Sequence, residues 1–286
     1  MEEMTTGLCP NCGQALQIPA ELESFSCMYC GERLTKRQLL TQAAAAQRSD
    51  EDCAASYDRA VARLGWCVKN FRGYQKKILR DAFFEAFETY ETGCAPVIQE
   101  LNNGITPERQ TELLDQAAEA MLDELSADWE KKTDMDDEKI ILAIFFVPMV
   151  RKLQLPVSEE FVTLLQKKWV ERYPKSPFYL GDYDSISGGF RKKFLGLCFI
   201  TTAVCQELGK PDNCAELTAF RAFRDGYLAS QPDGEALIHE YYNIAPGIVT
   251  CINTCSDRHT TYARIREECL APGYENLLAG RNVRCK

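Results

Sequence analysis

Four cysteines near the start of the chain have the residue type and spacing of a metal site. Cys9 and Cys12 are three residues apart, Cys27 and Cys30 repeat this spacing, and fourteen residues separate the two pairs. Two such pairs close together can surround one ion tetrahedrally with thiolate sulfur, which zinc favours in structural sites. Since thiolates take all four positions, none is left for a reactive water. The sequence therefore predicts one structural zinc ion.

The residues between the pairs predict a small β module. Polar and apolar residues alternate over 14–18 and 23–26, as in short strands, and residues 19–21 are expected to form the turn. Residues 1–34 are similar throughout to the rubredoxin-like zinc ribbons. A module of this size has little core of its own, so the metal must supply most of its folding free energy. An iron or redox centre on the same thiols is the alternative.

The charge of the chain argues against nucleic acid as a partner. Its 33 basic and 42 acidic residues give a formal net charge of −9, whereas phosphate binding needs a basic surface. Residues 14–26 of the ribbon contain no Lys or Arg that could meet a phosphate. The composition therefore favours a protein partner.

Cysteine usage and hydropathy indicate the compartment. The chain has 14 cysteines, and its first residues lack the basic and apolar stretches of a signal peptide. Because the paired cysteines need reduced thiols, we expect a cytoplasmic protein with free cysteines. The longest apolar run covers residues 140–150. It is shorter than the about 20 residues of a membrane span, so it predicts a buried helix and no membrane partner.

Beyond the ribbon, apolar residues recur at helical spacing without a strand pattern. Thr35 is expected to begin a helix. Ser49 and the acidic residues after it are expected to cap the next one, where acids favour the positive end of the helix dipole. The isolated cysteines of this region, Cys53, Cys67 and Cys94, are expected to be small buried residues.

The predicted fold is mainly α with a small N-terminal β ribbon. A segment with two prolines, several glycines and four aromatic residues interrupts the helical pattern and is interpreted as a linker. Helical periodicity then resumes in a cysteine-rich segment. The predicted parts are a zinc ribbon (1–34), an acidic helical bundle that starts with a connector helix (35–173), the linker (174–193) and a cysteine-rich helical domain (194–286).

The cysteine-rich domain begins with the string Cys-Phe-Ile-Thr-Thr-Ala at residues 198–203. This string, together with residues 217–228 and 241–249, resembles the CFI-box, a short C-terminal domain of bacterial proteins. The likeness covers about residues 197–255. It implies a bacterial source and a folded C-terminal module, and it brings no activity with it.

Charged residues lie beside an aromatic helix face in this domain. Arg221, Arg224 and Asp225 accompany Phe220 and Tyr227 at helical spacing. Such an arginine–aspartate pair can clamp a neighbouring helix through charge-assisted hydrogen bonds, or it can hold an anionic ligand. Paired charges on helix faces are common without a function, which favours the structural interpretation.

Seven cysteines fall in the last 89 residues of the chain: Cys198, Cys205, Cys214, Cys251, Cys255, Cys269 and Cys285. They fit small core residues, because cysteine is among the most buried residue types. A second interpretation is another metal site, formed by the first three or by Cys251 and Cys255, which would share a helix face. His239 or His259 would then complete the ligand set. In a third, Cys198 is a nucleophile with one of these histidines as its base.

Two functions remain open from the sequence. The first is a non-enzymatic adaptor whose ribbon and acidic bundle contact protein partners. The sequence contains no recognisable acid/base pair or glycine-rich phosphate loop, which favours this hypothesis. The alternative is a cysteine-dependent enzyme or a thiol redox sensor centred on Cys198.

Overall fold

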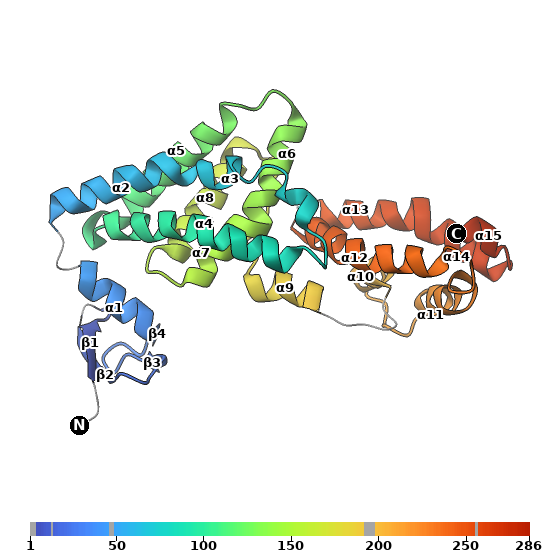
Figure 1. The fold of residues 1–286 in the computed structure, drawn as a ribbon, viewed down its shortest axis with the longest axis horizontal. Helices are drawn as coiled ribbons and strands as arrows, with labels where there is room; N and C mark the ends of the chain where they lie inside the picture. Colours follow the sequence, from blue (N-terminus) through green and yellow to red (C-terminus); the bar gives the residue numbers. More distant parts are fainter. Residues whose placement is uncertain (1–3, 13, 46–48, 192–197, 255–256) are drawn as a thin grey trace. The chain divides into compact units, whose positions relative to one another are not determined.

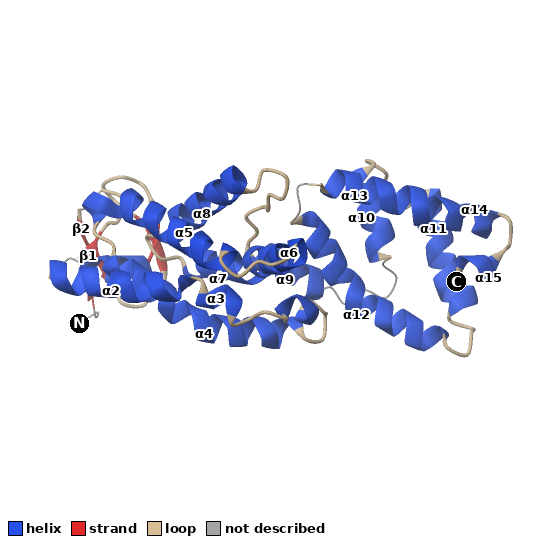
Figure 2. Cartoon of the chain, turned by 90° about the horizontal axis from the view of Figure 1, so that it is seen from above, coloured by secondary structure: helices blue, strands red, loops and turns tan. Residues whose placement is uncertain are grey.

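The chain is mainly helical, and its described strands all lie in the N-terminal segment (Figures 1 and 2). This confirms the predicted fold class. A computed structural model describes residues 4–12, 14–45, 49–191, 198–254 and 257–286. The chain divides into two compact units, which are Met1–Arg72 with Tyr90–Pro174, and Gly73–Thr89 with Lys175–Lys286.

Two antiparallel hairpins form the ribbon. Strand β1 (Met4–Leu8) pairs with β2 (Ala15–Pro19), and β3 (Ser24–Ser26) pairs with β4 (Arg33–Thr35). The two predicted strands correspond to β2 and β3, but each pairs with a strand that the sequence pattern missed. The reason is that each CxxC pair lies in the turn of its own hairpin. The predicted turn at 19–21 therefore connects two sheets instead of closing one.

Helix α1 (Lys36–Ala45) packs on the ribbon. Its Leu39 is fully buried and shares a core cluster with Leu16, Ile18 and Leu34. The approach is close, because a Cβ atom on Gly7 of β1 would lie 2.6 Å from the Leu39 carbonyl oxygen. The predicted connector helix thus completes the core of the ribbon.

The remaining helices of the first unit form the bundle. Helix α2 begins as predicted, with the Ser49 side chain accepting a hydrogen bond from the Asp52 N–H at 3.1 Å. Residues 141–150 are buried throughout, which confirms the predicted buried helix. The bundle comprises α2 (Asp50–Leu64), α3 (Trp66–Lys69), the later part of α4 (Phe83–Gly104), η2 (Pro107–Arg109), α5 (Gln110–Ser126), α6 (Lys132–Ile141), the π-helical η3 (Leu142–Phe146), α7 (Val147–Leu153) and α8 (Ser158–Arg172).

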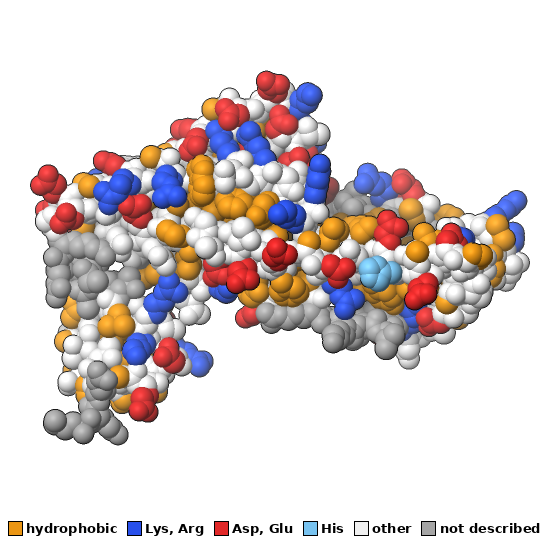
Figure 3. Space-filling view, in the orientation of Figure 1, with side chains coloured by type: hydrophobic (Ala, Val, Ile, Leu, Met, Phe, Trp, Pro, Cys, Tyr) orange, Lys and Arg blue, Asp and Glu red, His pale blue; other side chains and the backbone are white. Residues whose placement is uncertain are grey.

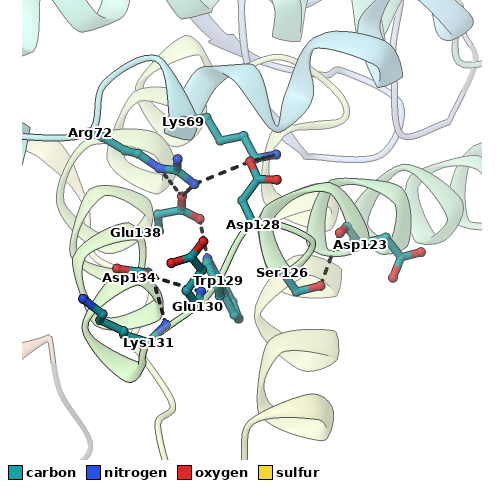
Figure 4. Close-up of polar contacts among 10 residues, drawn as sticks. All are labelled: Lys69, Arg72, Asp123, Ser126, Asp128, Trp129, Glu130, Lys131, Asp134 and Glu138. Atoms are coloured by element: carbon teal, nitrogen blue, oxygen red, sulfur yellow. Dashed lines mark hydrogen bonds and ion pairs between the residues drawn. The ribbon is translucent and has the colours of Figure 1, made fainter.

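A buried carboxylate ties α6 to the residues that follow α3 (Figure 4). Glu138 is 1% exposed, and its Oε1 accepts a hydrogen bond from Arg72 Nε at 2.7 Å. Its Oε2 accepts another from Trp129 Nε1 at 2.8 Å. Asp128 binds the Lys69 ammonium at 2.8 Å beside this group. Because donors meet both oxygens of Glu138, the desolvation penalty of the buried charge is offset.

The second unit joins residues far apart in the sequence. Phe83 stacks on Phe190 with ring centroids 4.3 Å apart, and a Cβ atom on Gly247 would lie 1.9 Å from the Ile78 carbonyl oxygen. Its elements are η1 (Tyr74–Lys77), the start of α4, α9 (Tyr183–Arg191), α10 (Phe199–Glu207), α11 (Ala215–Ala222), the π-helical η4 (Phe223–Leu228), α12 (Gly234–Asn253), α13 (Arg258–Ile265), the π-helical η5 (Arg266–Leu270), α14 (Ala271–Leu278) and α15 (Asn282–Cys285). The predicted linker, 174–193, therefore contains helix α9 and supplies a packed aromatic ring.

Among the described helices, none has both the length and the apolar character that a membrane span requires.

Candidate metal centre

The turns of the two ribbon hairpins bring four thiols together. Cys9 and Cys12 lie between β1 and β2, and Cys27 and Cys30 lie between β3 and β4. Their sulfur atoms all lie within 4.8 Å of one another. The Cys9 and Cys30 sulfurs are 3.8 Å apart, and the Cys12 and Cys27 sulfurs are 3.7 Å apart. A tetrahedral ion with metal–sulfur bonds of about 2.3 Å requires edges of about 3.8 Å. The donor set therefore fits a tetrahedral, thiolate-binding metal.

Backbone hydrogen bonds hold the turns in shape. The Cys27 N–H donates to the Glu32 carbonyl at 2.7 Å, and the Gly31 N–H donates to the Cys27 carbonyl at 2.8 Å. Gly31 has φ +76°, a conformation that glycine adopts without strain and that reverses the chain after the last ligand. The cysteine pair is thus held by a rigid turn. Cys9 and Cys27 are buried against the ribbon core, whereas Cys30 is exposed.

The thiols of the cluster differ in acidity. A hydrogen bond from the Asn11 amide, with a backbone hydrogen bond at Glu32, lowers the pKa of Cys30 to about 6. A backbone hydrogen bond at Gln14 lowers the pKa of Cys12, but desolvation and the neighbouring thiols outweigh it and raise this pKa to about 12. Crowded thiols cannot all ionise without a cation to neutralise them, so metal binding must release protons from this group.

Comparisons with known proteins identify no relative. No family model, curated protein or solved structure matches the chain. The similarity to zinc ribbons and to the CFI-box therefore remains a prediction from the sequence. The geometry of the side chains has to support any assignment of function.

The structure brings three of the predicted C-terminal residues together. Cys198 immediately precedes helix α10, and the Nη1 atom of Arg224 lies 3.7 Å from its sulfur. The same Nη1 donates to the Tyr242 hydroxyl at 2.9 Å, while two further nitrogens of Arg224 bind the Asp225 carboxylate at 2.7 and 2.8 Å. Arg224 is therefore a buried clamp between η4, α12 and the residue that precedes α10. Burial raises the pKa of Cys198.

Other predicted residues lie outside this clamp. Arg221 binds the carbonyl and the carboxylate of Asp212 at 2.8 and 2.9 Å. His239 is exposed on α12, and His259 pairs with Glu207. Of the two cysteines four residues apart, Cys251 is partly buried, and its partner lies outside the described residues. Among the residues that the structure describes, neither histidine hydrogen-bonds to Cys198.

Cys205 and Cys214 form a pair of their own. Their sulfurs are 3.7 Å apart, and both contribute with Cys198 to a small core cluster around Leu217. Within the described ranges, the ribbon thiols are the one group of three or more potential ligands whose donor atoms converge. Sequence reasoning missed Tyr242, because no local motif marks a contact made through tertiary packing. It grouped Cys205 and Cys214 only with Cys198, as possible ligands of a second metal site.

Proposed function

We propose that the chain is a zinc-binding, non-enzymatic adaptor that uses one structural zinc ion to present a protein-binding surface. The convergence of four thiols on one tetrahedral position carries the zinc assignment. The closed site leaves no position for a reactive water, which fits a structural zinc ion. A reducing compartment such as the cytoplasm would keep these thiols available.

The second hairpin turn provides the surface for contact. Met28 and Tyr29 lie between the ligands Cys27 and Cys30, and they are 76% and 61% exposed. A bound metal would fix the backbone on both sides of them, so two large apolar side chains would be held ready at low entropic cost. Aromatic residues and methionine are enriched in protein–protein interfaces. This arrangement supports a protein partner.

The charge distribution supports the same class of partner. On the face that Figure 3 shows, Lys and Arg side chains are interspersed with Asp and Glu, and the described residues form no continuous basic surface there. The chain as a whole carries −9. Nucleic acids require the opposite balance, because phosphate contacts dominate their affinity.

Cross-linked capture from the native host cells tests the adaptor function. The double variant Met28→Ser/Tyr29→Ser should recover about tenfold less of each partner than the unchanged chain does. This factor corresponds to an anchor pair worth about 1.4 kcal/mol of binding free energy. The matched control is Leu22→Ser, which removes a ribbon side chain that is 40% exposed. It should retain the partners. Equal recovery with all three chains would contradict the proposed surface.

The alternative is thiol chemistry at Cys198, and the Arg224 guanidinium is the observation in its favour. A nearby cation can stabilise a thiolate. However, Cys198 is only 7% exposed, and desolvation outweighs the cation and raises its pKa. A hydrogen-bonded base is also missing among the described residues. These features favour a core role for the thiol.

A further inference from the structure

A second pair of thiols meets where helix α10 turns into α11. Cys205 lies in the last turn of α10, and Cys214 is the residue before α11. Gly209 has φ +67° and turns the chain back. The Lys210 N–H then donates to the Cys205 carbonyl at 2.9 Å, which fixes the return. The backbone thereby holds two sulfurs 3.7 Å apart.

This pair lacks the ligands of a metal site. In the described part of the chain, no third histidine, cysteine or carboxylate joins these sulfurs as a converging donor set. Two thiols in contact without a metal can instead lose two electrons and join. The sulfurs would move from 3.7 Å to the about 2.0 Å of a disulfide, a shift that side-chain rotation and a small helix movement can supply.

Access to the pair is asymmetric. Cys214 is partly exposed, whereas Cys205 is buried and lines a cavity of 150 Å³ with Lys210, Glu216 and Phe220. Desolvation and the Cys214 thiol raise the pKa of Cys205 to about 12. Cys214 is therefore the sulfur that meets a small oxidant first, and Cys205 is placed to react with the product.

We propose that Cys205 and Cys214 are an oxidative modification site that a hydroperoxide converts into a reversible disulfide. The Cys214 thiolate attacks one oxygen of hydrogen peroxide, the O–O bond breaks, and the released hydroxide takes up the thiol proton as water. The Cys205 sulfur then attacks the resulting sulfenic acid, and the S–O bond breaks. The second hydroxide leaves with the Cys205 proton. In total, two thiols and one peroxide yield one disulfide and two waters.

The modification would act on the cavity beside the pair. Glu216 lies in the first turn of α11, and it forms an ion pair with Lys210 across the turn. Both residues line the cavity. Drawing Cys214 towards α10 therefore shifts part of the cavity wall. This inference does not depend on the zinc site or on the adaptor function.

Peroxide treatment of the full, metal-containing chain tests the proposal. The protein is exposed to one equivalent of hydrogen peroxide, alkylated in denaturant and digested with a protease that cleaves after glutamate. Cleavage at Glu207 separates Cys205 from Cys214. Alkylation of Cys198, which stays with Cys205 in the peptide 172–207, shows which of these two cysteines is linked. We expect a cross-linked peptide that contains Cys205 and Cys214 and that dithiothreitol divides. It should form at least about tenfold faster than any product of Cys67 and Cys94, which are fully buried.

Single variants assign the order of events and can overturn the proposal. Cys205→Ser should stop the cross-link and leave a Cys214 sulfenic acid that dimedone traps. Cys214→Ser should leave Cys205 reduced. The proposal is wrong if both thiols remain alkylatable while other cysteines of the chain oxidise. A cross-link from Cys205 to Cys198 would equally overturn it.

Discussion

The ribbon and the C-terminal unit both gather cysteines, yet they build different sites. In the ribbon, each hairpin turn delivers two sulfurs, and two turns converge on one position with four donors. In the C-terminal unit, the end of one helix and the start of the next deliver one sulfur each. The number of cysteines does not set the chemistry, since the C-terminal segment has seven and the ribbon only four. The backbone element that carries the cysteines sets the chemistry.

The surroundings of the two sites reinforce this difference. The ribbon thiols contribute to the core of a module that has few other buried residues, so ligand loss removes much of its stability. Cys205 and Cys214 lie beside Leu217 in a unit with many other packed helices. Substitution of Cys205 or Cys214 should therefore cost this unit little of its folding stability. Loss of a ribbon ligand is thus expected to leave the 205–214 pair intact, and oxidation of that pair is expected to leave the metal bound.

The largest expected effect is the loss of the metal. Cys12→Ser removes one of four ligands, and structural zinc contributes about 10–16 kcal/mol to the folding of small zinc modules. Elemental analysis should give one zinc per unchanged chain and a strongly reduced content in the variant. Limited proteolysis should cut the ribbon and α1, which packs on it, while the far-UV circular dichroism signal of the bundle helices is largely retained. Cys53→Ser, which changes an isolated thiol, should retain the metal. Two ions per chain would indicate a second metal site.

A smaller effect is expected on the stability of the bundle, which contains neither thiol site. Glu138→Gln removes the charge that Arg72 and Trp129 bind. Because the Arg72 side chain is 47% exposed and stays solvated, the loss should be about 1–3 kcal/mol. Glu159→Gln is the matched control, because Glu159 binds Arg151 but is 66% exposed. It should cost less than about 1 kcal/mol. Urea unfolding measures both changes. Metal content should not change in either variant, and its loss in Glu138→Gln would show that ribbon and bundle fold together.

The smallest expected effect is a ranking of thiol reactivity. With limiting iodoacetamide at neutral pH, Cys214 should react a few-fold faster than Cys198 and Cys205, because it is the least buried of the three. The ribbon thiols should react only after a chelator removes the metal. Cys198 should react no faster than Cys53 or Cys67. Selective early labelling of Cys198 would instead favour the cysteine-dependent alternative.

Local signals in the sequence predicted the elements that depend on neighbouring residues. The spacing of Cys9, Cys12, Cys27 and Cys30 predicted the thiol cluster, and Ser49 predicted the start of α2. Strands β1 and β4 were missed, because Met4–Leu8 shows no clear alternation and the three residues Arg33–Thr35 directly precede a helix.

Contacts between distant residues could not be predicted in this way. The clamp of Arg224 on Tyr242 and Cys198 depends on how three helical elements pack. The grouping of residues 73–89 with the C-terminal unit likewise depends on contacts such as the stacking of Phe83 on Phe190. No periodicity within a single segment records such contacts. For the same reason, the sequence left the roles of the C-terminal cysteines open.

The close fit of Gly7 against Leu39 determines where the ribbon can be cut from the chain. A fragment that ends at residue 34 would carry all four thiols but would expose the apolar surface that Leu39 covers. Burial of one leucine side chain is worth about 1.5–3 kcal/mol. A fragment that runs to residue 45 keeps this contact. The portable unit for transplantation into another protein is therefore the two hairpins together with α1.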